Sequence, residues 1–172
     1  MGLDVSSLDL RDALDLAILM EEEARQRYTE FTRQVGGRYT GDAADVFRLM
    51  AAYEEKHGLQ LVARRRSLFQ DQPSRMRLDM LDDLEAPDRS VPRVFMSARE
   101  AMAVAIDSEE KAFQFFDQAL RRVTDPQVKA LFIELRGEEL EHKRLLEERI
   151  EALPVGPDMV EADADQPGSD GG

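Results

Sequence analysis

Apolar residues recur every three or four positions along four long stretches of the chain, which is the spacing of a helix with one buried face. The four predicted helices span about residues 7–34, 42–68, 97–123 and 126–153. The turn between the first two helices and the turn between the last two are short, so each pair consists of antiparallel neighbours. The pattern therefore predicts two helical hairpins.

Residues with strong capping preferences mark the ends of these helices. Ser6 or Ser7 can cap the first helix, and Gly36-Gly37 can stop it. Ser97-Ala98-Arg99-Glu100 is a capping-box sequence at the start of the third helix. Thr124-Asp125-Pro126 makes a tight turn and opens the fourth helix with a proline in its first turn.

A long connection without helical periodicity joins the two hairpins between residues 69 and 96. It contains prolines and one short helix-like piece around residues 77–84. Extended at about 3.3 Å per residue, this connection can run the length of a bundle, so the third helix can lie parallel to the second. We therefore expect an all-α, four-helix bundle with a long crossover between its second and third helices.

One domain covering residues 1–153 is the simplest organisation for a chain of 172 residues. Residues 154–172 are rich in Asp, Gly and Pro and carry little apolar content. Such a composition cannot bury enough apolar surface to offset the entropy of ordering the chain. We expect this segment to be a disordered acidic tail.

Acidic and imidazole side chains interrupt the apolar face of each helix near its middle. The first and third helices carry a single glutamate there, whereas the second and fourth carry a Glu-x-x-His pair, whose members share one helix face. The interrupting residues are Glu21, Glu54 with His57, Glu109, and Glu139 with His142. The second hairpin thus repeats the pattern of the first.

Four carboxylates and two imidazoles in an apolar interior require a compensating positive charge. Desolvating each ion costs several kcal/mol even after relaxation, and no Lys or Arg lies on these stripes. Two divalent cations would offset four ionised carboxylates, and mixed oxygen and nitrogen ligands suit Fe, Mn or Zn. The sequence therefore predicts a dinuclear metal site at mid-height of the bundle.

At these residues the chain resembles rubrerythrin-type, ferritin-like di-iron proteins, over roughly residues 8–152. The resemblance implies a ferritin-like bundle, a dinuclear iron cofactor that Mn or Zn could replace, and oxidation of Fe(II) with O2 or peroxide. It gives the bridging ligands as Glu54 and Glu139, and the terminal pairs as Glu21 with His57 and Glu109 with His142. Tyr28 matches a tyrosine that such proteins often place beside the metals, and is the candidate catalytic residue. A homodimer and an electron donor of unknown identity are further family-level expectations.

Two departures from the family pattern bear on the activity. Ala112 stands where rubrerythrins carry an additional glutamate, three residues after the ligand Glu109. That carboxylate is linked to redox-dependent iron movement in the family, so its loss argues against rubrerythrin-like peroxidase cycling. The absence of cysteine excludes a rubredoxin-type iron centre on this chain. A plainer ferroxidase or oxygen-reducing site is compatible with both departures.

The net charge and hydropathy of the chain limit the classes of partner that it can bind. The formal net charge of −13 argues against binding to nucleic acid, which requires a clustered basic surface. No apolar run approaches the roughly 20 residues of a membrane-spanning helix, and the first residues lack the pattern of a signal peptide. We therefore expect a soluble cytoplasmic protein with no membrane partner, whose small-molecule substrate is O2 or peroxide.

Simpler interpretations exist for each of these features. Each Glu-x-x-His pair could belong to a charged, solvated helix surface, because 34% of the residues are charged. Tyr28 could be an ordinary core residue whose hydroxyl bonds to a nearby carboxylate. A non-catalytic metal-binding or iron-handling protein, or a purely helical interaction module, could also use the same bundle.

Overall fold

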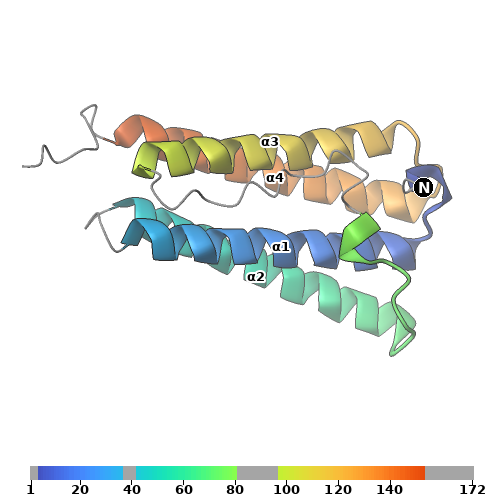
Figure 1. Cartoon of the computed structure of the whole chain (residues 1–172). Coiled ribbons are helices and arrows are strands. Elements are labelled where there is room, and N and C mark those ends of the chain that lie inside the picture. Colours follow the sequence, from blue (N-terminus) through green and yellow to red (C-terminus); the bar gives the residue numbers. More distant parts are fainter. Residues whose placement is uncertain (1–3, 37–41, 81–96, 154–172) are drawn as a thin grey trace, which may run out of the picture.

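The computed structural model describes residues 4–36, 42–80 and 97–153 (Figure 1). Its four long helices are α1 (Leu10–Gly36), α2 (Asp42–Phe69), α3 (Ala98–Leu120) and α4 (Pro126–Ala152). Two single 3-10 turns, η1 (Val5–Ser7) and η2 (Leu78–Met80), complete the elements of these ranges, which include no strand. The prediction of an all-α, four-helix bundle is confirmed.

The helices pack as the two predicted hairpins, α1 against α2 and α3 against α4. Figure 1 shows α2 and α3 running in the same direction, as a long crossover allows. Where the structure describes the crossover, its predicted helix-like piece is limited to η2. The rest of that piece falls in residues 81–96, which lie outside the described ranges, as does the predicted acidic tail of residues 154–172.

Capping side chains fix the start of both helices of the second hairpin. The hydroxyl of Ser97 accepts a hydrogen bond from the backbone N–H of Glu100, and the Glu100 carboxylate accepts one from the N–H of Ser97. This is the predicted capping box. Asp125 caps α4 by accepting from two backbone N–H groups of its first turn. α3 ends at Leu120, slightly before the expected Val123, because the chain turns there toward α4.

The first helix begins later than the sequence suggested. Ser6 and Ser7 lie in η1 rather than at the cap of α1, so that prediction is wrong. The carboxylate of Asp9 instead accepts a hydrogen bond from the backbone N–H of Asp12, 2.9 Å away. Aspartate caps a helix as well as serine does, and here it is the residue immediately before the first helical turn.

Two apolar clusters fill the bundle, one on each side of a polar layer. One cluster is drawn from residues 5–20, Leu61 and residues 112–135. The other is drawn from residues 28–50, residues 98–105 and Leu146. In each helix the interrupting polar residues fall between these two sets, so apolar side chains close the layer from both ends. None of the described helices is both long and apolar enough to cross a lipid bilayer.

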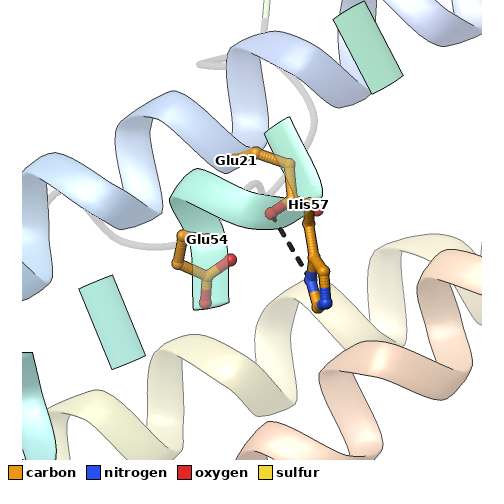
Figure 2. A group of neighbouring side chains, drawn as sticks. All are labelled: Glu21, Glu54 and His57. Atoms are coloured by element: carbon orange, nitrogen blue, oxygen red, sulfur yellow. Dashed lines mark ion pairs between the residues drawn. The ribbon is translucent and has the colours of Figure 1, made fainter. Parts of the chain in front are cut away.

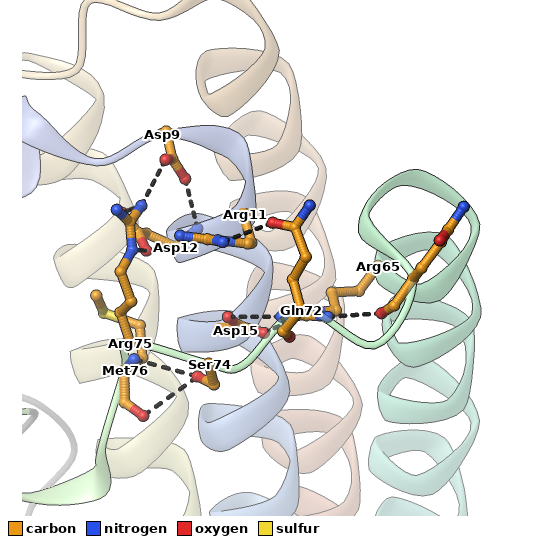
Figure 3. A network of polar contacts seen from close by, with 10 residues as sticks. Asp9, Arg11, Asp12, Asp15, Arg65, Gln72, Ser74, Arg75 and Met76 are labelled. Atoms are coloured by element: carbon orange, nitrogen blue, oxygen red, sulfur yellow. Dashed lines mark hydrogen bonds and ion pairs between the residues drawn. The ribbon is translucent and has the colours of Figure 1, made fainter.

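Salt bridges tie the start of the crossover to the first turns of α1 (Figure 3). Arg65 at the end of α2 donates to the carboxylate of Asp15 at 2.8 Å and to the carbonyl of Gln72 at 2.6 Å. Arg75 donates to both carboxylate oxygens of Asp12, at 2.8 and 2.6 Å. Asp12 and Asp15 are only 7% and 6% exposed, so the arginines supply the positive charge that these buried carboxylates require.

Candidate metal centre

Six polar side chains, contributed by all four helices, occupy the layer between the two apolar clusters. The four most buried are between 3% and 6% exposed, and the other two, His57 and Glu139, are partly exposed. The four are Glu21, Glu54, Glu109 and His142. A solvated helix surface, the simpler interpretation of the Glu-x-x-His pairs, does not describe Glu54 or His142. Charged groups buried to this extent need partners that carry the opposite charge.

A first group of donor atoms comes from α1 and α2 (Figure 2). Donor atoms of Glu21, Glu54 and His57 all lie within 4.8 Å of one another. The Nδ1 atom of His57 is 4.0 Å from Oε2 of Glu21. Gly58 lies where the two helices approach each other, and a Cβ at that position would lie 3.6 Å from the Cβ of Glu21, an ordinary van der Waals distance. A larger side chain there would press on the glutamate.

A second group joins the two hairpins. Donor atoms of Glu54, Glu109 and His142 also lie within 4.8 Å of one another. The Nδ1 atom of His142 is 3.1 Å from Oε1 of Glu54 and 3.5 Å from Oε2 of Glu109. Glu54 is therefore common to both groups, with a glutamate and a histidine on either side of it. A carboxylate in this position can hold two ions at once.

Glu139 is the one predicted ligand outside both groups of three in the described part of the chain. Its carboxyl group faces that of Glu109 closely enough for a hydrogen bond when one of them is protonated. Burial, together with the charge of Glu109, raises the pKa of Glu139 well above its ordinary value. The structure thus places Glu139 at the site through Glu109, and its bridging role stays a prediction.

Unpartnered donor atoms show that the residues present fit a bound cation. Four buried atoms at this layer have no hydrogen-bond partner among the described residues, although most buried polar atoms in proteins have one. They are Glu21 Oε2, Glu54 Oε1, His57 Nδ1 and His142 Nδ1. Carboxylate oxygens and imidazole nitrogens in this combination suit Fe, Mn or Zn. A cation would satisfy all four atoms together.

The proton affinities of the cluster reflect its crowded negative charge. Burial raises the pKa of Glu21 to about 10, and the neighbouring carboxylate of Glu54 contributes in the same direction. Burial by itself would lower the pKa of His142, but the carboxylates of Glu109 and Glu54 raise it to about 11. Burial would likewise raise the pKa of Glu109, yet His142 holds it below its ordinary value. Without a metal cation, bound protons therefore supply the positive charge that balances these carboxylates.

Tyr28, the candidate catalytic residue, lies beside the second group. Its side chain is fully buried, and its hydroxyl donates a hydrogen bond to Oε1 of Glu109. Its ring packs against Phe31 and Phe47 in the adjoining apolar cluster. Tyr28 is therefore a core residue whose hydroxyl bonds to a carboxylate of the site, as the simpler interpretation expected, and its catalytic role stays a prediction.

Two neighbours of the site are missed by sequence reasoning. The ring of Tyr53 stacks on His142 with centroids 6.0 Å apart, and His142 stacks on His57 at 5.4 Å. Oε2 of Glu138 lies 3.8 Å from Nδ1 of His57. Tyr53 is four residues before His57, so helical spacing could have placed it on the same face. Glu138 gave no such signal, because adjacent charged residues on α4 resemble a solvated surface.

Comparison with known proteins gives one family and two solved structures. The family model described as Rubrerythrin matches residues 12–150. An uncharacterised conserved protein from Magnetospirillum magnetotacticum MS-1 is 28% identical, with a TM-score of 0.71, covering 86% of this chain and 97% of its own. A hypothetical protein from Pyrococcus furiosus is 20% identical, with a TM-score of 0.63, covering 87% and 95%, and indicates the fold alone. No curated protein matches. The bundle is therefore ferritin-like.

Proposed function

The chain belongs to the rubrerythrin family, and from this premise we propose that it is a di-iron oxidoreductase that oxidises Fe(II) with O2 or peroxide. The observation that carries the proposal is the position of Glu54, whose carboxylate is common to both groups of donor atoms. A bridging carboxylate of this kind is what a dinuclear site in a four-helix bundle requires. Two separate mononuclear sites would not need to share it.

The ligand assignment follows from the two groups. Glu21 with His57 would hold one ion, and Glu109 with His142 the other. Glu54 would bridge the two ions, and Glu139, which faces Glu109, would be the second bridge. Bound iron would supply the one-electron redox steps and the Lewis acidity that oxidation by O2 or peroxide needs.

The protein's own residues set the environment for this chemistry. The two apolar clusters exclude water from both ends of the layer, which strengthens electrostatic interactions within it. Tyr28 fixes the orientation of Glu109 through its hydroxyl. Ala112 is 6% exposed and packs in an apolar cluster, so no carboxylate stands where rubrerythrins carry an additional one. This supports a ferroxidase or oxygen-reducing site over a rubrerythrin-like peroxidase cycle.

Metal content of protein purified without chelator tests the dinuclear site. We expect about two Fe per chain, and loss of both in the double variant His57→Ala plus His142→Ala. The matched control is Gln60→Ala plus Arg144→Ala, which alters two exposed residues on the same helices and should keep the iron. Iron retained by the histidine variant would contradict the ligand assignment. Two Zn or Mn in place of Fe would keep the site and argue against iron as its native metal.

Stopped-flow oxidation of added Fe(II) tests the activity itself. We expect the rate to fall by about 100-fold in Glu54→Ala, because the variant lacks the ligand common to both groups. An unchanged rate in this variant would contradict the proposal. Wild-type protein that retains iron without oxidising it would instead support a non-catalytic, iron-handling role for the same ligands.

A further inference from the structure

A cavity of about 480 Å³ lies between α2 and α4. The two histidines of the candidate centre, His57 and His142, contribute to its lining. Its wall also contains Glu134, Gly137, Glu138 and Glu141 of α4 and Lys56 of α2. The cavity thus leads from a surface with three carboxylates and one ammonium group to both imidazoles of the site.

The glutamates of this wall differ in how their charge is balanced. Glu134 pairs with Arg64 at 3.1 Å, and Glu141 pairs with Arg144 at 3.1 Å. Glu138 has no ion pair with Lys or Arg among the described residues. The nearest basic group that it contacts is the imidazole of His57, whose Nδ1 lies 3.8 Å from its Oε2. Lys56 of the same wall lies beyond ion-pair distance of Glu138.

The inner end of the cavity carries two of the unpartnered donor atoms of the candidate centre. The side chain of His142 is only 8% exposed, lines the cavity, and has an Nδ1 atom without a hydrogen-bond partner. His57 lines the same cavity with its own unpartnered Nδ1. An ion moving inward would meet Glu138 first and then His57. The spacing of these groups permits one ligand to be exchanged for the next.

A second cavity, of about 310 Å³, approaches Glu54 from the other side, between α1 and α2. Each cavity is lined by three glutamates and one cationic side chain, Lys56 in the first and Arg25 in the second, so charge does not distinguish them. The second cavity reaches the centre only at Glu54, whereas the first is lined by both imidazoles. Of the two cavities, the one between α2 and α4 therefore gives an ion access to more of the candidate ligands.

We propose that the cavity between α2 and α4 is the entrance through which a divalent metal cation reaches the centre, with Glu138 as the carboxylate that binds the ion first and passes it to His57. This inference rests on the proposed function, since it assumes that the six-residue cluster holds metal. Glu138 acts in transit and is not one of the final ligands. Its removal therefore slows loading without changing how much metal is finally bound.

Anaerobic loading with Co(II) tests the entrance without any redox chemistry. Stopped-flow absorbance follows the rate, and metal analysis after equilibration gives the final amount bound. We expect Glu138→Gln to load about tenfold more slowly than wild type, with a weaker dependence on salt, and to reach the same final amount. The matched control Glu55→Gln removes the same charge at the edge of the other cavity and should load at the wild-type rate.

A pair of variants at Gly137 tests the cavity as a passage. A Cβ at this position meets nothing within 4 Å, so Gly137→Ala should fold and load as wild type does. Gly137→Leu places a branched side chain in the cavity and should slow loading while leaving every ligand unchanged. Melting temperatures of both variants show whether the bundle is intact.

The outcomes of these experiments distinguish failure of the proposed entrance from failure of the proposed metal centre. Wild-type loading rates in both Glu138→Gln and Gly137→Leu would overturn the entrance and leave the centre in place. Slower loading in Glu55→Gln than in Glu138→Gln would assign the passage to the cavity between α1 and α2. A reduced final amount of Co(II) in Glu138→Gln would make Glu138 a resident ligand, which contradicts the transit role. Wild-type protein that binds neither Co(II) nor Fe(II) would overturn the proposed function together with its entrance.

Discussion

The carboxylate of Glu54 on α2 lies 3.1 Å from Nδ1 of His142 on α4, yet these two atoms form no hydrogen bond. Each helix packs mainly against its own hairpin partner, so this polar contact is one of the places where the hairpins meet. The two groups attract each other as an ion pair, but neither atom has a hydrogen-bond partner, so both can bind a third group. A cation between them would satisfy both atoms and hold the hairpins together.

The shared position of Glu54 predicts an unequal effect of single ligand substitutions. Glu54→Gln should weaken the binding of both ions, so bound iron should fall from about two per chain to well below one. Glu21→Gln alters only the group on α1 and α2, and should leave about one ion per chain. Metal analysis of the two variants, prepared in parallel, measures the difference.

Equal losses in Glu54→Gln and Glu21→Gln would show that Glu54 does not bridge. The metal-free forms give a second check. Glu54 supports the charge of His142 in the metal-free protein, so Glu54→Gln should lower the melting temperature there by less than it lowers that of the iron-loaded protein. Equal losses in the two forms would point to a structural role instead.

The raised proton affinities of the cluster predict that the metal-free protein loses stability as the pH rises. The folded-state pKa of Glu21 is raised from 4.5 to about 10, so its contribution is present below 4.5 and is lost progressively above that value. The pKa of His142 is raised from 6.5 to about 11, so its contribution is lost above 6.5. Both groups therefore lower the free energy of unfolding as the pH rises through neutrality.

Chemical denaturation of the metal-free protein between about pH 5 and pH 9 measures this effect. Glu21 alone accounts for a slope of about 1.4 kcal/mol in the free energy of unfolding per pH unit. The same series on Glu21→Gln should show a shallower slope. Iron should reverse the trend, because metal binding displaces these protons and so tightens as the pH rises. A slope that is unaffected by Glu21→Gln would contradict the assignment.

Tyr28→Phe tests the hydroxyl that orients Glu109. The substitution keeps the buried ring and removes the hydrogen bond, so Oε1 of Glu109 loses its donor. We expect the metal-free protein to lose about 1–3 kcal/mol of stability. Iron content should be retained, while the rate of Fe(II) oxidation should fall by about tenfold, since Tyr28 acts on the site through a ligand. An unchanged oxidation rate at full iron content would show that Tyr28 has only a packing role.

Hydrophobic periodicity was sufficient to predict the four helices, because each buries one apolar face, and clear caps mark the starts of α3 and α4. The crossover could not be predicted in the same way, since the contacts of its described part depend on long-range ion pairs such as Arg75 with Asp12. These partners are far apart in the sequence and follow no helical spacing. The first cap was misassigned for a related reason, because Ser7 and Asp9 are chemically similar caps and only the path of η1 distinguishes them.

The candidate site was accessible from the sequence because its residues repeat in the two hairpins and stand out on apolar faces. Grouping them by donor atoms required the structure, which gives Glu54 to both groups and leaves Glu139 against Glu109. Glu138 could not be found from its position, because its proximity to His57 depends on how α4 crosses α2. Helical spacing predicts which residues share a face of one helix, but it does not predict the contacts between the two hairpins.

Gly58 lies next to His57, where α1 and α2 approach each other, and a Cβ there would lie 3.6 Å from the Cβ of Glu21. That distance is an ordinary van der Waals contact, so Gly58→Ala should fit and raise the stability by up to about 1 kcal/mol through its better helix propensity. Gly58→Leu adds a branched side chain beside Glu21, so we expect it to weaken binding of the ion held by Glu21 and His57 more than binding of the other ion. Thermal unfolding and metal analysis of both variants measure these effects. If Gly58→Leu kept its full metal content, the position of Glu21 would not depend on this contact, and the first group of donor atoms would be more adaptable than the packing of α1 on α2 implies.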